Sequence, residues 1–259
     1  MPDIVILTRL GRPSGEEILR RLLLAGERVA AVIAEPRSSL LMQRGLPAFL
    51  KGSLRKHGVR QLVTKALGEV RETVRRLVNP GERTGLVEMA RKRGIPLYVV
   101  SDHNGEECLA HLSSIKPDIV ITANTRVLKS KVLAQAAIGT INLHKSKLPQ
   151  YAGLESIFWA LYHGEKKLGV TVHLVTSGID TGDIICQRTF AVEPGDTLQT
   201  LDKKANELGA ELMVEAVRLL RAGLRRFTPQ DLSKRSYFSW PTPEQRQELA
   251  RRMPGGRIR

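Results

Sequence analysis

Residues 138–188 read IGTINLHKSKLPQYAGLESIFWALYHGEKKLGVTVHLVTSGIDTGDIICQR, and this stretch decides the fold that the rest of the chain is expected to adopt. Residues 140–144 form a short apolar segment, which predicts a strand that carries Asn142 and His144 near its end. Side chains two residues apart on a strand point to the same face of the sheet. Ligands bind at the carboxyl ends of the strands in open α/β sheets. The sequence therefore predicts that Asn142 and His144 lie together at a place suited to chemistry.

A second predicted strand and the loop after it add two carboxylates to the same stretch. Residues 170–176 alternate in polarity, as expected of a strand, and residues 177–183 follow as SGIDTGD. Glycine permits backbone conformations that other residues avoid, so the two glycines indicate a tight loop. Asp180 and Asp183 are alternative candidates for a functional acid.

These motifs resemble those of the folate-dependent formyltransferases, a family that includes glycinamide ribonucleotide transformylase, methionyl-tRNA formyltransferase and sugar N-formyltransferases. The resemblance is strong from about residue 115 to 205 and weak elsewhere. It rests on separated motifs that agree in order and spacing: Asn142-Leu143-His144, Ser146, Leu148-Pro149, Gly153 and Ile179-Asp180-Thr181-Gly182-Asp183. Carried over by motif, it implies that Asn142, His144 and Asp180 are catalytic, and it favours Asp180 over Asp183.

The resemblance also implies a co-substrate, 10-formyltetrahydrofolate. In the family, the loop that corresponds to residues 124–128 contacts the pterin largely through backbone groups. The residues that the resemblance implies for folate binding lie in two loops: Arg126, Val127, Leu128, Thr176, Gly178 and Ile179. The alternative for residues 124–128 is a helix-entry loop with one exposed arginine.

The three implied catalytic residues match the chemistry of formyl transfer to an amine. That reaction passes through a tetrahedral intermediate whose oxygen becomes negative, while the amine loses a proton. Asn142 can donate its amide N–H to that oxygen, and a protonated His144 can donate another hydrogen bond. Asp180, if it lies beside His144, is expected to favour the imidazolium and to relay a proton through an ordered water. Neither a covalent nucleophile nor a metal is needed.

Each of these residues also has a purely structural interpretation when it is considered alone. A lone histidine at a strand end is more often a satisfied polar residue than a catalyst, and Asn142 and Asp180 suit turns. Taken together in the family order, the three favour catalysis. His163 and His173 lie on predicted regular structure outside the motifs, so we expect them to be structural.

The chain as a whole predicts an α/β protein with a mostly parallel, doubly wound, Rossmann-like sheet of the formyltransferase type. Residues 1–192 are expected to form the catalytic domain, and residues 193–259 a helical C-terminal extension. Short apolar segments separated by helical patterns support this prediction. The opening strand, turn and helix contain no GxGxxG motif, so they do not indicate a dinucleotide site.

Helix ends and the tail give more local predictions. Ser14 is the expected N-cap of the first helix, which ends near Leu24, and Asp196 or Thr197 is the expected cap of a long helix to about Ala222. Aromatic residues are expected to anchor the tail against the body: Tyr237, Phe238 and Trp240.

Residues 36–80 depart from the compact pattern of the family. Apolar residues recur at helical spacing from about 54 to 78, and basic residues lie mostly off that stripe. This basic amphipathic helix either packs on the domain with a solvated outer face, or offers a surface to an anionic acceptor or lipid head groups.

Composition limits the classes of partner and compartment. The 41 Lys and Arg residues exceed the 26 Asp and Glu residues, for a net charge of +15. This charge either favours anionic partners such as folate polyglutamate, nucleotides, RNA or an acidic membrane, or is a solvated basic surface.

Cys108 and Cys186 form no CxxC or Cys/His cluster, which argues against a zinc site and a disulfide framework. The chain shows neither a signal-peptide pattern nor a transmembrane run, so we expect a cytoplasmic protein.

The acceptor is the feature that the sequence determines least. Arg9 and Arg12 stand where the ribonucleotide enzymes have a glycine- and asparagine-rich phosphate loop, and we expect the residues after 224 to be too few for the C-terminal barrel of the tRNA enzymes. Both differences favour a small amine acceptor, such as an amino sugar nucleotide. The alternatives are a tRNA-formylating enzyme without the barrel, a formyltetrahydrofolate hydrolase, and a non-catalytic folate- or RNA-binding protein. Lys147, beside the predicted acceptor channel, either attracts an anionic acceptor or points to solvent.

Overall fold

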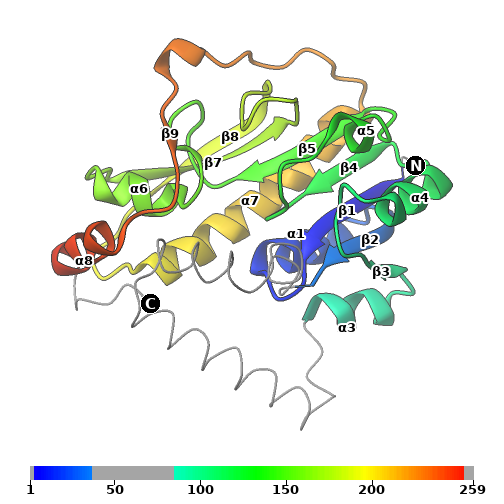
Figure 1. The fold of residues 1–259 in the computed structure, drawn as a ribbon, viewed down its shortest axis with the longest axis horizontal. Helices are drawn as coiled ribbons and strands as arrows, with labels where there is room; N and C mark the ends of the chain where they lie inside the picture. Colours follow the sequence, from blue (N-terminus) through cyan, green and yellow to red (C-terminus); the bar gives the residue numbers. More distant parts are fainter. Residues whose placement is uncertain (1–2, 37–84, 254–259) are drawn as a thin grey trace, which may run out of the picture.

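A seven-stranded sheet forms the centre of the protein in the computed structural model, which describes residues 3–36 and 85–253 (Figure 1). The order of the strands across the sheet is β3-β2-β1-β4-β5-β7-β8. Neighbours from β3 to β5 are parallel, whereas β7 is antiparallel to both β5 and β8. The strands are β1 (Ile4–Arg9), β2 (Val29–Glu35), β3 (Leu97–Val99), β4 (Ile119–Thr122), β5 (Gly139–His144), β7 (Lys167–Leu174) and β8 (Ile184–Ala191). The predicted fold class is confirmed.

Alternation along β1 shows why the sheet is covered on both faces. Ile4 and Ile6 pack into one hydrophobic cluster, and Val5 and Leu7 pack into another on the opposite face. All four side chains are fully buried. A strand that is apolar on both faces needs helices on both sides, which is the arrangement of a doubly wound sheet.

The helices divide between these two faces (Figure 1). The larger cluster contains side chains of α1, α3, α6 and α7, and the smaller cluster contains those of α4 and α5. The bounds are α1 (Pro13–Leu24), α3 (Gly85–Lys92), α4 (Glu106–Ile115), α5 (Ser130–Leu133), α6 (Ser156–Tyr162), α7 (Leu198–Arg221) and α8 (Pro243–Arg252). Helix α7 lies beside α1 and contributes side chains to the same core as the sheet. The predicted division into a catalytic domain, residues 1–192, and a C-terminal extension, residues 193–259, stays a prediction.

The two predicted helix caps had different outcomes. Thr197 caps α7, because its hydroxyl accepts a hydrogen bond from the N–H of Thr200, as expected. The prediction that Ser14 caps α1 is wrong: the helix begins at Pro13, and its N-cap residue, Arg12, makes no side-chain cap. The hydroxyl of Ser14 instead donates to Oδ1 of Asn206 on α7 at 2.6 Å, which ties the two helices together.

The C-terminal part of the chain returns to the body of the protein, as predicted for its aromatic residues. Strand β9 (Tyr237–Phe238) pairs in parallel with β6 (Ala152–Gly153), and the ring of Phe238 stacks on that of Trp159. A single turn of 3-10 helix, η1 (Leu232–Lys234), precedes β9. Helix α8 follows and packs beside α6 (Figure 1).

Two further expectations concern other parts of the chain. The basic amphipathic helix predicted at about 54–78 lies outside the described residues. Of the helices in residues 3–36 and 85–253, none is long and apolar enough to cross a membrane.

The contact between α1 and β1 gives a test of the fold. A Cβ atom on Gly15 would lie 2.3 Å from Oγ1 of Thr8, whose side chain is buried and bonded to the carbonyl of Ala123. Gly15→Ala is therefore expected to push α1 off the sheet and to lower the free energy of unfolding by about 1–3 kcal/mol. Urea denaturation measures this, with the exposed Leu24→Ala on the same helix as the control. An unchanged midpoint for Gly15→Ala would show that the helix is not packed this closely.

Candidate active site

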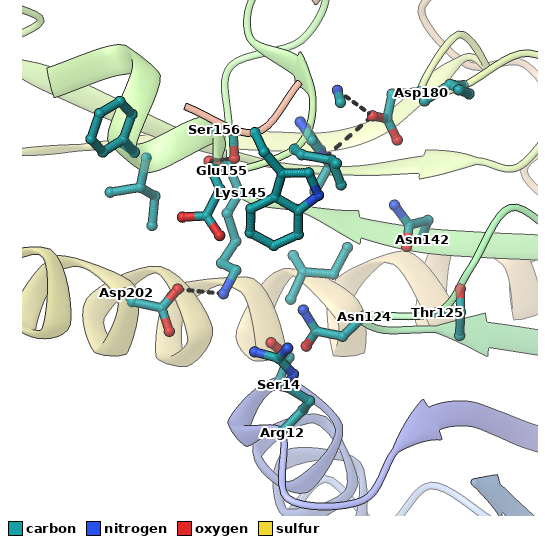
Figure 2. Close-up of a pocket in the computed structure, with 18 of the residues that line it drawn as sticks. Arg12, Ser14, Asn124, Thr125, Asn142, Lys145, Glu155, Ser156, Asp180 and Asp202 are labelled. Carbon is teal, nitrogen blue, oxygen red and sulfur yellow. Dashed lines mark hydrogen bonds and ion pairs between the residues drawn. The ribbon is translucent and has the colours of Figure 1, made fainter. Parts of the chain in front are cut away.

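A cavity of about 1760 Å³ opens at the carboxyl ends of β1, β4 and β5 (Figure 2). It is the place where open α/β sheets bind ligands. All nine residues implied for catalysis or folate binding line it: Asn142, His144, Asp180, Arg126, Val127, Leu128, Thr176, Gly178 and Ile179. Figure 2 shows Asn142 and Asp180 entering the cavity from different elements.

Asn142 is held in a row of three side chains that crosses three neighbouring strands. Thr122 of β4 is opposite Asn142 of β5, which is opposite His173 of β7. The hydroxyl of Thr122 donates to Oδ1 of Asn142 at 2.8 Å, so the Asn142 amide nitrogen is turned toward Nε2 of His173, 3.2 Å away. His173 then carries its proton on Nδ1, which donates to the carbonyl of Leu174 at 2.7 Å. This row determines the orientation of the Asn142 amide.

His144 lies between two loops. Its Nε2 is 2.9 Å from the carbonyl oxygen of Tyr151, so Nε2–H donates there and Nδ1 carries the lone pair. Nδ1 faces Oδ2 of Asp180 at 3.6 Å. Oδ2 of Asp180 also accepts a 2.8 Å hydrogen bond from the N–H of Gly153, and its Oδ1 lies 3.6 Å from Nε2 of His173. The carboxylate of Asp180 therefore faces both imidazoles.

The expectation that His144 is an imidazolium is not met. Burial lowers the pKa of His144, and this outweighs the attraction of Asp180 and the hydrogen bond to Tyr151, which raise it. Positive charge on His173, when its imidazole is protonated, and on Lys145 lowers the pKa of His144 further. His144 is therefore a neutral base at neutral pH.

For the pKa of Asp180, the neighbouring groups have a larger effect than burial, which is the reverse of the balance at His144. Burial opposes its ionisation, but the neighbouring imidazoles of His144 and His173 and the N–H of Gly153 outweigh burial and lower the pKa of Asp180 to about 2. Asp180 is therefore ionised beside a neutral histidine. Its backbone is in the left-handed region, with φ of 53°, which is uncommon for a residue other than glycine.

A second group of charged side chains lies under the loop of residues 126–128. Glu35, at the end of β2, is fully buried. It accepts two hydrogen bonds from the guanidinium of Arg126, at 2.7 and 2.8 Å, and one from the N–H of His103 at 2.9 Å. Nε of Arg9 lies 3.4 Å from its carboxylate. Burial opposes ionisation, but the bonds from His103 and Arg126 hold the pKa of Glu35 well below its usual range.

This arrangement determines how Arg126 contributes to the cavity. Its guanidinium is only 19% exposed and is engaged by Glu35, with Oδ1 of Asp102 also 3.2 Å away, so the alternative of a simple exposed arginine is excluded. Asn104 supports the same loop, because its amide donates to the carbonyl of Val127 at 3.0 Å. The loop therefore presents its backbone and the side chain of Val127, which is exposed.

Other sequence candidates lie elsewhere. Among the described residues that line the cavity, Asp180 is present and Asp183 is not, which agrees with the choice of Asp180. Lys147 is exposed and is likewise outside that lining, so the structure favours the solvent alternative for it. Lys145, two residues earlier, lines the cavity and pairs with Asp202 of α7 (Figure 2).

Sequence reasoning missed His173 and Glu35. The assignment of His173 to a purely structural role is incomplete, because it lines the cavity and contacts Asn142. Polar Thr171 and His173 alternate with apolar residues along β7, which was the available signal. For Glu35 the signal was a charged residue at the end of an apolar strand, as at Arg9.

Comparison with known proteins identifies the family. The family described as Formyl transferase matches residues 72–217, more than half of the chain. The chain belongs to the formyl transferase family. The methionyl-tRNA formyltransferase of Kosmotoga olearia is 37% identical over 162 residues, 62% of this chain and 52% of that protein. That of Thermotoga maritima is 33% identical over 155 residues, 60% of this chain and 50% of that protein. This formyl transferase chain thus spans about half the length of the curated relatives that it matches.

Solved structures agree with the fold. Glycinamide ribonucleotide transformylase 1 from Symbiobacterium toebii superposes with a TM-score of 0.63 at 23% identity, covering 89% of this chain and 93% of that one. The N-formyltransferase from Helicobacter canadensis, solved with folinic acid and dTDP-3-aminofucose, gives a TM-score of 0.58 at 19% identity, covering 92% and 71%. At these identities the likeness shows the fold alone.

The Glu35 cluster predicts a pH-dependent stability. The pKa of Glu35 is lower in the folded protein than in the unfolded chain, so its contribution to stability is present above its ordinary pKa and is lost as the pH falls toward the folded-state pKa. Glu35→Gln is expected to cost about 3 kcal/mol at neutral pH, because it leaves buried cationic groups uncompensated. The difference from wild type should shrink below about pH 4. Urea denaturation across this range measures it, and Glu88→Gln, at an exposed pair with Lys92, is the control. Equal losses for the two variants would contradict the cluster.

The contact of Asp180 with His144 predicts the direction of a titration. Asp180→Asn removes the charge that opposes the effect of burial, so the pKa of His144 should fall below its wild-type value. Histidine C–H signals followed by NMR against pH measure this shift. Asp183→Asn, which removes a carboxylate outside the cavity lining, should leave the pKa of His144 unchanged. A rise in the His144 pKa in Asp180→Asn would refute the assignment.

Proposed function

We propose that this protein is an N-formyltransferase that moves a formyl group from 10-formyltetrahydrofolate to an amine. The observation that carries the proposal is the convergence of Asn142, His144 and Asp180 on one cavity in a member of the formyl transferase family. Each is held by a different partner, Asn142 by Thr122, His144 by the carbonyl of Tyr151 and Asp180 by the N–H of Gly153, yet all three line the same cavity.

The cavity fits a folate together with a second reactant. Pockets for a single drug-sized molecule have volumes of about 300–1,000 Å³, and this cavity has about 1760 Å³. The loop of residues 126–128 offers backbone groups and an apolar side chain to a pterin. Ile179, which is 39% exposed, adds a second apolar side chain to the lining. When bound, 10-formyltetrahydrofolate supplies the formyl group on its N10 atom.

Asn142 serves as the donor to the formyl oxygen. An amide nitrogen carries two hydrogens, and one of those on Asn142 is directed to His173. The other is available for the oxygen on which negative charge develops during attack by the amine. Because Thr122 and His173 hold the amide in place, the donor is preorganised and needs no rearrangement during the reaction.

His144 and Asp180 serve to transfer the proton that the attacking amine loses. A neutral His144 with its lone pair on Nδ1 can accept the proton that the attacking amine must lose. The resulting imidazolium carries Nδ1–H toward the carboxylate of Asp180, which stabilises it. The proton then passes to N10 as the bond from N10 to the formyl carbon breaks. One C–N bond forms, one breaks, and one proton moves between the two nitrogens.

A small polar amine is the acceptor that the cavity lining supports best. Beside the catalytic residues, the lining contains charged side chains of both signs and an indole: Lys145, Glu155, Asp202, Trp240 and Arg246. Several of these come from the C-terminal part of the chain, which closes one wall of the cavity. A compact acceptor with many hydrogen-bonding groups, such as an amino sugar nucleotide, suits such a wall.

A methionyl-tRNA acceptor is the second candidate. It is favoured by one observation, that the curated relatives at 33–39% identity are methionyl-tRNA formyltransferases. Tight binding of tRNA that weakens steeply with salt would support it, because phosphate contacts release counterions.

Turnover of 10-formyltetrahydrofolate to tetrahydrofolate tests the proposal. Wild type is expected to react only when an amine acceptor is present, and Asn142→Ala should lower kcat by about 100-fold or more through loss of one oxyanion donor. Absorbance follows the reaction across a panel of amino sugar nucleotides and initiator methionyl-tRNA, with no acceptor as the control.

The outcomes separate the alternatives. Formylation of methionyl-tRNA alone would replace the small acceptor by the second candidate. Turnover without an acceptor would indicate a formyltetrahydrofolate hydrolase. Folate binding without turnover under any condition would refute the enzyme and leave a binding protein.

A further inference from the structure

The C-terminal strap, residues 228–240, crosses the edge of the candidate active site. At one end, Thr228 exchanges two backbone hydrogen bonds with Ile184 at the start of β8, at 2.8 and 3.0 Å. At the other end, the carbonyl of Phe238 accepts a hydrogen bond from the N–H of Leu154 at 2.9 Å, and the carbonyl of Ser239 accepts one from the indole of Trp159 at 2.8 Å. The strap is thus anchored on both sides of the two loops that surround His144.

The first loop that the strap holds contains Asp180. The side-chain amide of Gln230 donates to the carbonyl of Asp180 itself at 3.0 Å and to that of Gly182 at 2.6 Å. The guanidinium of Arg235 donates to the carbonyl of Ile179 at 3.0 Å. The carbonyls of Ile179, of Asp180 itself and of Gly182, two residues farther on, are therefore bonded to the strap. A non-glycine residue with positive φ needs such support from its surroundings.

The second loop that the strap holds supplies the other contacts of the catalytic pair. The hydroxyl of Ser236 accepts a hydrogen bond from the N–H of Tyr151, and its carbonyl accepts one from the N–H of Ala152, both at 2.9 Å. Tyr151 is the residue whose carbonyl accepts from His144, and Gly153 next to Ala152 donates to Asp180. Strap contacts thus flank both backbone groups that touch the catalytic side chains.

We propose that Gln230, in the C-terminal strap, is a positioning residue that holds Asp180 against His144. This inference rests on the proposed function for its effect on turnover, while the geometry that it describes can be tested separately. Gln230 touches neither reacting group, and it acts through the backbone of Asp180.

Two observations distinguish a positioning role for Gln230 and the strap from a strap that merely lies on the surface of the domain. The amide oxygen of Gln230 is buried without a hydrogen-bond partner among the described residues, so the side chain is oriented by its two donor contacts alone. The strap also fits closely against the second loop, because a Cβ atom on Gly153 would lie 2.3 Å from the carbonyl oxygen of Phe238. A segment that only covered the surface would not need either arrangement.

Gln230→Met tests the proposal, because it keeps the size of the side chain and removes both donors. The expected result is a kcat about 100-fold lower, since a displacement of about 1 Å at a catalytic group has that effect. The KM for 10-formyltetrahydrofolate and the affinity for folinic acid, used as a non-transferring probe, should change by a much smaller factor than kcat. The pKa of His144 should fall toward its value in Asp180→Asn; the groups that face His144 are Asp180, His173 and Lys145.

Two control variants accompany it. Gln135→Met removes another glutamine that donates to a backbone carbonyl, that of Lys131, away from the cavity. Lys234→Met changes an exposed side chain within the strap itself. Both should keep wild-type kcat and the wild-type pKa of His144.

The outcomes are distinct. Wild-type kcat and His144 pKa in Gln230→Met would overturn the proposal, and so would an equal loss in Gln135→Met or Lys234→Met. If wild type transfers no formyl group, the proposed function fails, but a lower His144 pKa in Gln230→Met still supports the positioning role. If Gln230→Met does not fold, Arg235→Met, which removes the bond to Ile179, must show the same shift in the His144 pKa, or the proposal is refuted.

Discussion

The register of β4, β5 and β7 is the constraint on which the candidate active site depends. It places Thr122, Asn142 and His173 side by side on one face of the sheet, where each fixes the hydrogen bonding of the next. A slip of one residue would turn every side chain of a strand to the other face and disperse the row. The antiparallel strand β7 is essential here, because it brings a histidine from a later part of the chain opposite Asn142.

The fold could be predicted because its signals are local. Apolar strands, the Thr197 cap and the shared face of Asn142 and His144 all depend on residues close in sequence. Ser14 was misread for the opposite reason. Its neighbours resemble a helix start, but its hydroxyl bonds to Asn206, which lies 192 residues away. Likewise, no local pattern predicts that His173 lies opposite Asn142, because that contact depends on the pairing of β5 with β7.

The electrostatics of the site could be predicted only in part for the same reason. Sequence reasoning took the proximity of Asp180 and His144 as a condition, which the structure meets with a distance of 3.6 Å, and such a carboxylate alone would favour an imidazolium. Burial is the competing effect, and it arises from the closure of several loops around the ring. In the folded protein it exceeds the attraction of the carboxylate, so the pair consists of an ionised acid and a neutral base. This combination suits the removal of a proton from an amine better than the donation of one.

Different interactions stabilise the two sides of the cavity: buried ion pairs on one side and hydrogen bonds from the C-terminal strap on the other. On the side of residues 126–128, buried charges around Glu35 join the ends of β1, β2 and the segment after β4. On the side of Asp180, the side chains of Gln230, Arg235 and Ser236 hold the loops through hydrogen bonds to backbone groups. The first side depends on the sheet, and the second depends on chain that follows α7. The same C-terminal part also supplies Trp240 and Arg246 to the cavity lining. The segment that we propose to position Asp180 is therefore continuous with the wall that contains Trp240 and Arg246, so a change in contacts at that wall is expected to alter the geometry of Asp180 as well.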